Sequence, residues 1–186
     1  MAANEGARSF VYESTRDRTP LGHAHREHIR DLSVSEIREM YRQAVNKLLN
    51  EVTETEQFFR AGIVAIDITE ADPFTGDRTG HEGEIIGTKE KTDEYAYQWA
   101  TVQLVGNAVP IVLDARPVQK GESRLEIVED LLESAEEMVH VDNVLMDREF
   151  DSQHVLEMLS QRGLSYVVPK RMQTSEKAQA KRLLRR

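Results

Sequence analysis

The order of apolar and polar positions predicts one amphipathic helix near the start of the chain. Ser33, followed three residues later by Glu36, forms a capping box that marks where this helix begins. Apolar residues then recur at helical spacing, at Ile37, Met40, Tyr41, Ala44, Leu48, Leu49 and Val52. We therefore expect a helical segment over residues 32–59, preceded over residues 1–31 by a flexible arm without sustained periodicity.

Further along, the pattern predicts strand, strand, strand, helix, strand, helix and strand. The run AGIVAIDIT is rich in β-branched residues and predicts a buried strand that ends near residues 67–69, followed by a loop over residues 71–94. Residues 95–105 and 108–115 predict an antiparallel hairpin, with the single Trp99 expected in the sheet core. The remaining elements are expected over residues 124–138, 139–146, 153–162 and 164–168.

The composition excludes several kinds of site. The chain of 186 residues contains no cysteine, which excludes disulfides, thiolate zinc sites and a cysteine nucleophile. Any metal must therefore be held by oxygen or imidazole ligands. No stretch approaches the ~18 apolar residues that span a membrane, and the N-terminus lacks the apolar core of a signal peptide. We therefore expect a cytoplasmic protein with no membrane partner.

The formal charge of −9 argues at first against a nucleic-acid partner, yet the charge is unevenly distributed. Residues 170–186 hold seven of the 24 basic residues and one of the 33 acidic residues, so the rest of the chain holds 17 basic and 32 acidic residues. A basic tail suits contacts with the DNA backbone, because each neutralised phosphate releases counterions. The candidate DNA contacts are Lys170, Arg171, Lys181 and Arg182, and a helix end that faces water is the alternative.

Two aspartates carry the most specific chemistry. Asp67 and Asp147 each follow an apolar strand, and ligand sites of open α/β sheets lie at that edge. On neighbouring strands their carboxylates would lie within about 6 Å of each other and repel unless a cation lies between them. Hard oxygen ligands suit Mg²⁺ or Mn²⁺, which activate a hydroxyl and stabilise the leaving oxygen of a phosphodiester. Arg148 is a candidate phosphate contact or part of a surface ion pair.

The sequence around both aspartates resembles the DDE transposases of insertion sequences, in particular those of haloarchaea. The resemblance lies in AIDIT with Asp67, the strand PIVLDARPV and the block VLMDREF with Asp147. It implies an α/β ribonuclease H-like mixed sheet over residues 60–169, built from a three-strand meander, helix, strand, helix and strand, and followed by a basic helix-prone tail over residues 170–186. It also implies that both aspartates are catalytic ligands of Mg²⁺ or Mn²⁺. Such an enzyme cuts transposon ends and joins the freed 3′ hydroxyl to double-stranded target DNA.

The sequence departs from the family pattern at the third acidic residue. The family has a Glu on a later helix, often within Tyr-x2-Arg-x3-Glu-x6-Lys, and Glu176 lacks the Tyr and Arg at the required offsets. We therefore expect a transposase fragment, truncated before the third acidic residue. A second copy of the chain, in a homodimer, is one candidate partner. Two alternatives stay open. One is an inactive remnant that binds DNA or a full-length copy, and the other is a generic ribonuclease H-like nuclease with its remaining acidic ligands in this chain.

Overall fold

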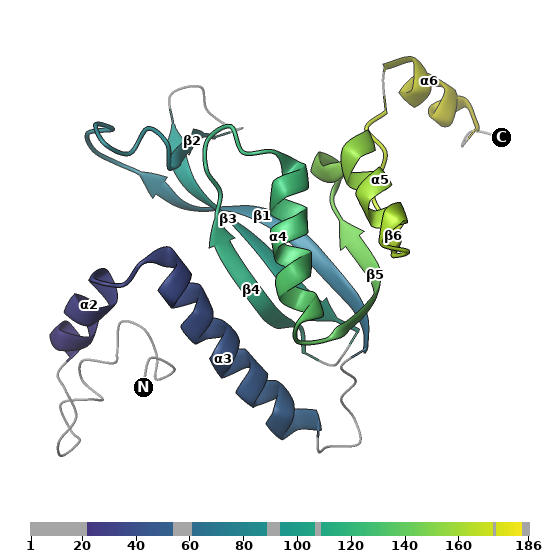
Figure 1. Cartoon of the computed structure of the whole chain (residues 1–186). Helices are drawn as coiled ribbons and strands as arrows, with labels where there is room; N and C mark the ends of the chain where they lie inside the picture. Colours follow the sequence, from purple (N-terminus) through teal and green to yellow (C-terminus); the bar gives the residue numbers. More distant parts are fainter. Residues whose placement is uncertain (1–21, 54–60, 89–93, 107–108, 173, 184–186) are drawn as a thin grey trace. The chain divides into compact units, whose positions relative to one another are not determined.

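The computed structural model describes most of the chain, namely residues 22–53, 61–88, 94–106, 109–172 and 174–183 (Figure 1). Internal contacts divide the chain into two units, residues 1–43 and residues 44–186, and each is described by itself. The second unit contains the sheet and therefore both aspartates.

Two helices begin in the first unit. α2 (Gly22–Arg30) lies where the sequence pattern predicts an irregular arm. Its residues include good helix formers but few apolar ones, so helix propensity forms an element that apolar periodicity does not reveal. α3 (Val34–Thr53) begins as predicted, because the backbone N–H of Glu36 donates to Ser33 Oγ at 3.3 Å and that of Ser33 donates to Glu36 Oε2 at 2.8 Å. The predicted continuation of this segment to residue 59 lies outside the described residues.

A mixed sheet of six strands forms the centre of the second unit. The strands are β1 (Ala61–Phe74), β2 (Ile85–Gly87), β3 (Tyr95–Val105), β4 (Ile111–Pro117), β5 (His140–Met146) and β6 (Ser165–Val167). Their order is β2-β3-β1-β5-β6, and β4 also pairs with β3. β3 runs antiparallel to β1, β2 and β4, whereas β5 runs parallel to β1 and β6. The predicted α/β class with a mixed sheet is confirmed.

Helices pack against this sheet and enclose the core. α4 (Arg124–Glu136) packs against β3, β4 and β5, and α5 (Gln153–Gln161) packs against α4 and β6 (Figure 1). Ser123 and Glu126 form a capping box at the start of α4. The core between α4 and the sheet contains Val64, Ile66, Val102, Leu104, Val144, Ile127, Val128, Leu131, Leu132 and Ala135. Val45 and Leu49, from the second half of α3, belong to the same cluster.

The last helix, α6 (Thr174–Leu183), forms within the segment predicted to be a helix-prone tail. Its residues are mainly polar and basic, and it includes only one acidic side chain, Glu176. None of the helices in the described part of the chain is both long and apolar enough to cross a membrane.

The sheet has one buried face and one half-exposed face, because side chains alternate along each strand. On β1, Val64 and Ile66 are buried whereas Asp67 and Thr69 are exposed. On β3, the buried residues alternate in the same way, at Ala96, Gln98, Ala100, Val102 and Leu104. Asp67 therefore lies on the face opposite the helical core. Trp99 lies on that face as well and is 39% exposed, so the prediction that it packs in the sheet core is wrong.

β1 is longer than the sequence predicts. It continues past Asp67 to Phe74 through a β-bulge between Glu70 and Asp72, and β2 forms inside the segment predicted to be a loop. The long β3 strand provides partners along this whole length. Beyond Ile66, β1 no longer pairs with β5, so Pro73 lies on an edge of the sheet, where proline is tolerated.

Arg116 links β4 to α4 through two carboxylates. Its Nη1 donates to Asp130 Oδ2 at 3.0 Å, and its Nη2 donates to Glu122. Glu122 also accepts a hydrogen bond from the backbone N–H of Gln119 at 3.0 Å. Its carboxylate therefore links the loop after β4 to Arg116 on the strand. The side chains of Arg116 and Glu122 are only 16% and 13% exposed. If the ion pair is broken, water therefore solvates the remaining charge poorly.

Replacing Arg116 with methionine is expected to lower the free energy of unfolding by about 2 kcal/mol, because the carboxylate of Glu122, only 13% exposed, loses its cation in a poorly hydrated place. Arg162→Met is the matched control. Arg162 also pairs with two carboxylates, those of Glu133 and Glu136, but these are 69% and 39% exposed. We expect this variant to lose only about 0.5 kcal/mol. Urea unfolding followed by circular dichroism measures both, and equal losses would contradict the role given to Arg116.

Candidate metal site

β1 and β5 place the two aspartates at neighbouring positions. The strands pair in parallel, and their last Cα partners are Ile66 and Met146. Asp67 and Asp147 are the next residues along each strand, and neighbouring strands lie about 4.8 Å apart. Beyond this point β1 continues with β3, where Asp67 is the partner of Thr101. The structure therefore brings the predicted pair together where β5 ends.

A short turn fixes the Asp147 side chain. Met146 is buried, and Asp147 keeps an extended backbone with φ −77° and ψ 174°. The alternation of the strand therefore carries the Asp147 side chain to the face on which Asp67 lies. Asp147 caps the 3₁₀ helix η2 (Arg148–Phe150), because its Oδ1 accepts the backbone N–H of Glu149 at 2.7 Å. Phe150, which is fully buried, anchors this turn in the core.

Asp67 is oriented by its own strand. Its Oδ2 accepts a hydrogen bond from Thr69 Oγ1 at 3.1 Å, and both side chains are exposed. In Asp67 and in Asp147, one carboxylate oxygen is thus held in place. The other oxygen of each makes no hydrogen bond to any residue that the structure describes. Two exposed carboxylates with one open oxygen each, on adjacent strands, suit a shared divalent cation.

The donor set fits Mg²⁺ or Mn²⁺ as an incomplete shell. Mg²⁺ is commonly bound through one or two carboxylates, with water and substrate phosphate oxygens in the remaining positions. Within the described ranges, no three His, Cys, Asp or Glu side chains lie together in a way that would hold a metal by themselves. Glu176, the acidic residue of the tail, accepts a hydrogen bond from Lys170 Nζ at 2.5 Å. A cation at Asp67 and Asp147 therefore needs further ligands from water or substrate.

Arg124 is a charged neighbour of the site that the sequence analysis missed. It is the first residue of α4, and its Nη2 lies 3.4 Å from Oε2 of Glu149, the residue whose backbone N–H binds Asp147. Burial lowers the pKa of the Arg124 guanidinium, and the negative charge of Asp147 opposes this shift. A basic residue in the first turn is unfavourable to the helix dipole. That mismatch is the signal in the sequence that indicates a role outside the helix.

Two of the predicted DNA contacts lie at the same turn. Arg171 Nε donates to the backbone carbonyl of Arg148 at 2.9 Å, and the backbone N–H of Arg171 donates to Asp151 Oδ2 at 2.5 Å. Arg148 is exposed. The positive charge of Arg171 also contributes to lowering the pKa of Arg124. Arginines from α4, from η2 and from the segment after β6 therefore surround the turn that begins at Asp147.

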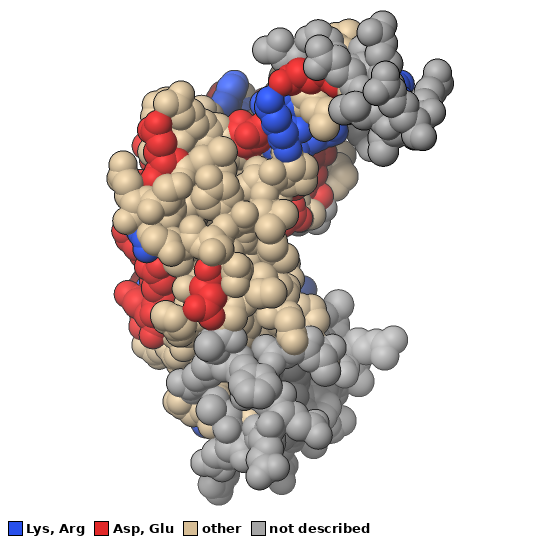
Figure 2. All heavy atoms as spheres, turned by 90° about the vertical axis from the view of Figure 1, so that its right-hand side faces the viewer, with Lys and Arg blue, Asp and Glu red and all other residues tan. Residues whose placement is uncertain are grey.

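The other predicted DNA contacts are more scattered. Lys170 forms an ion pair with Glu176, Lys181 is exposed on α6, and the side chain of Arg182 lies outside the described residues. On the face drawn in Figure 2, Lys and Arg side chains gather near the top, next to Asp and Glu side chains. The basic groups seen on this face of the described residues therefore stand among acidic ones and form no continuous basic surface.

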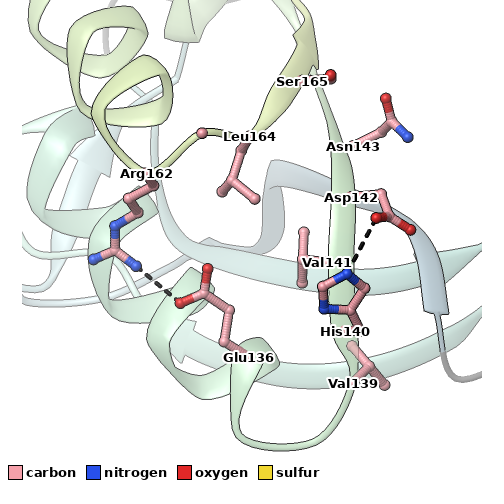
Figure 3. Close-up of a pocket in the computed structure, with 10 residues that line it drawn as sticks. Glu136, Val139, His140, Val141, Asp142, Asn143, Arg162, Leu164 and Ser165 are labelled. Atoms are coloured by element: carbon pink, nitrogen blue, oxygen red, sulfur yellow. Dashed lines mark hydrogen bonds and ion pairs between the residues drawn. The ribbon is translucent and has the colours of Figure 1, made fainter.

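A separate hollow of about 510 Å³ lies at the other end of β5. Figure 3 shows that its charged lining residues pair among themselves: Arg162 with Glu136 at 3.0 Å, and His140 with Asp142 at 3.2 Å. His140 begins β5 whereas Met146 ends it, so this hollow and the aspartate pair lie at opposite ends of the strand. The chemistry predicted for Asp67 and Asp147 has no counterpart in these ion pairs.

Comparisons with known proteins leave the assignment to the site itself. No protein-family model matches the chain, and no curated protein matches it. The two aspartates, the arginines beside them and the sheet that positions them are the features that bear on function.

A titration with Mn²⁺ tests the site. Electron paramagnetic resonance measures binding as the loss of the free-ion signal. Asp67→Asn and Asp147→Asn are each expected to weaken binding at least about tenfold, because each removes a charged oxygen ligand. Asp142→Asn is the matched control. Asp142 is an exposed aspartate of β5 that pairs with His140, far from the strand end, and its loss should leave the affinity unchanged. Undiminished Mn²⁺ binding in the Asp67→Asn Asp147→Asn double variant would place the ion elsewhere.

Proposed function

We propose that this chain is the partial catalytic core of a DDE-type transposase, with a ribonuclease H-like fold and metal-dependent phosphodiester chemistry on DNA. The observation that carries the proposal is the adjacency of Asp67 and Asp147 at the point where the parallel β1–β5 pairing ends. Four strands joined by antiparallel pairing (β1 to β4) are followed by two parallel ones (β5 and β6), with helices between β4 and β5 and between β5 and β6, and this order supports the fold assignment.

Each residue of the site has a defined task in this proposal. A bound Mg²⁺ or Mn²⁺ would activate the attacking hydroxyl and stabilise the leaving oxygen of a phosphodiester. Asp67 and Asp147 would hold that ion through their open carboxylate oxygens. Glu149 holds Asp147 through its backbone N–H, and Arg124 holds the Glu149 side chain in turn. Arg124 is therefore a positioning residue whose charge also favours an incoming phosphate.

Double-stranded DNA, at transposon ends and at a target, is the substrate in this proposal. Arg148, Lys170, Arg171, Lys181 and Arg182 remain the candidate backbone contacts. Arg148 and Arg171 are the stronger ones, because they lie at the turn that begins with Asp147. Pairing of two copies as a homodimer stays a prediction.

A binding protein without catalytic activity is the second candidate. The observation that favours it is that the described acidic residues supply a pair of ligands and no group of three. The same observation disfavours the generic ribonuclease H-like nuclease within the described residues, since that enzyme would hold its remaining acidic ligands in this chain. Cleavage of DNA separates the catalytic candidate from the binding one.

Nicking of supercoiled plasmid DNA in Mg²⁺ or Mn²⁺ is the direct test of catalysis. The unchanged chain should nick the plasmid in either ion and not in EDTA, and Asp67→Asn and Asp147→Asn should each reduce the rate by at least about a hundredfold. Asp142→Asn should cleave at the normal rate. If the chain binds the plasmid but does not nick it in either metal, this result would support the inactive binding protein and overturn the catalytic proposal.

Replacing Arg124 tests its contribution to phosphate binding. Arg124→Gln should weaken binding of a DNA duplex and reduce by about 1 the slope of log affinity against log salt, because one phosphate contact is lost. Arg124→Lys should keep the slope and lose part of the affinity, since lysine keeps the charge but not the forked geometry. Fluorescence anisotropy with a labelled duplex measures both quantities. An unchanged salt slope in Arg124→Gln would restrict Arg124 to positioning Glu149.

A further inference from the structure

A row of aromatic side chains on the half-exposed face of the sheet leads to the aspartate pair. Tyr95, Tyr97 and Trp99 alternate with buried residues along β3, so all three lie on one face. Asp67 lies on the same face, as the partner of Thr101 in the β1–β3 pairing. Trp99 is therefore the member of this row that lies nearest to Asp67.

Trp99 is one cross-strand pair away from the metal site. Its partner on β1 is Thr69, and Thr69 Oγ1 donates to Asp67 Oδ2 at 3.1 Å. Diagonal neighbours in an antiparallel pair lie about 7–8 Å apart, which is within reach of a large aromatic ring. The indole of Trp99 and the carboxylate of Asp67 can thus contact the same bound molecule.

Trp99 differs from the other two aromatic residues of the row in lacking a ring partner. The guanidinium of Arg78 lies 4.5 Å from the ring centre of Tyr95, and Phe74 packs edge-on against Tyr97 with ring centres 5.8 Å apart. Trp99 makes no ring contact with any residue in the described ranges and is 39% exposed. A large apolar ring left open to water beside a charged site is unusual for tryptophan, which is mostly buried or at interfaces.

We propose that Trp99 is a stacking site for an unpaired nucleobase of the DNA strand whose phosphate would meet the divalent cation held by Asp67 and Asp147. This inference rests on the proposed function. Every base has an apolar ring face, and stacking on an exposed aromatic side chain is a general way to bind single-stranded nucleic acid. Stacked nucleotides are spaced about 3.4 Å apart along a strand, so the distance from Asp67 to Trp99 corresponds to about two nucleotides.

The base must be unpaired for a geometric reason. Inside a duplex both faces of each base are covered by its neighbours, and a protein reaches a base face only in a single strand or after the base has left the stack. Trp99 thereby specifies the form of the substrate: DNA that is single-stranded or locally opened within about two nucleotides of the reacting phosphate.

Tryptophan fluorescence, excited at a wavelength that tyrosine does not absorb, reports on this site alone, because Trp99 is the only tryptophan in the chain. The experiment titrates the full chain, in Ca²⁺ buffer, with three probes: a short single-stranded oligonucleotide, the fully paired duplex of that sequence, and a backbone of equal length that lacks bases. The single strand should quench the emission strongly and in a saturable manner. The duplex and the abasic backbone should quench it weakly, although anisotropy shows them bound.

Variants separate stacking from general binding. Trp99→Leu should weaken binding of the single strand about tenfold, and Trp99→Phe should recover most of the loss, because phenylalanine keeps a ring face. Tyr166→Leu is the matched control. Tyr166, on β6, is 38% exposed, nearly the same as Trp99, and its loss should leave single-strand affinity unchanged.

The outcomes distinguish this inference from the proposed function. Metal-dependent nicking that depends on Asp67, combined with equal quenching by the abasic backbone and the single strand, would overturn stacking and leave the transposase proposal intact. Base-dependent quenching without any nicking would support stacking in a binding protein. Absence of quenching by any probe, or equal affinity of Trp99→Leu and the unchanged chain for the single strand, would overturn the stacking site.

Discussion

The parallel pairing of β1 with β5 is the constraint on which the rest of this account depends. It ends at Ile66 and Met146, so the next residue on each strand is an aspartate beside another aspartate. Neighbouring strands lie about 4.8 Å apart, and two like charges at about that distance repel by roughly 1–4 kcal/mol, depending on how well water screens them. An opposing interaction must therefore stabilise this register, and it lies on the other face of the sheet.

The buried face fixes the register. Val64, Ile66, Val144 and Met146 alternate with the exposed positions and pack into the core beneath α4. A slip of one residue would turn these apolar side chains to water and bury a carboxylate, so the hydrophobic core opposes it strongly. The core thus holds the two aspartates side by side even though they repel. The same logic extends to η2, where buried Phe150 fixes the turn that orients Asp147.

Much of this arrangement is predictable from local sequence patterns. The period-two alternation around Ile66 and the helical spacing of Leu131, Leu132 and Ala135 are sufficient to predict the core elements, and the run ending at Met146 predicts the strand before Asp147. The length of β1 was not predictable in this way, because Asp72 and Pro73 have turn propensities that the pairing with β3 overrides. Tertiary pairing decides such cases.

The neighbours of the site were harder to predict than the aspartates. Arg124 reaches Glu149 across 25 positions of sequence, a contact that depends on how α4 crosses the sheet. Trp99 was expected in the core because tryptophan usually is buried, yet the parity of β3 turns it to the open face. Chain parity and helix placement are properties of the assembled sheet, which is why residue type alone gave the wrong expectation.

The most direct test of the central claim is the position of the cation itself. Crystals soaked in Mn²⁺ and measured by anomalous diffraction would locate the ion without any assumption about activity. We expect an anomalous peak between β1 and β5, within about 2.2 Å of one carboxylate oxygen of Asp67 and one of Asp147. A peak bound by other residues, with no density between these two aspartates, would contradict it.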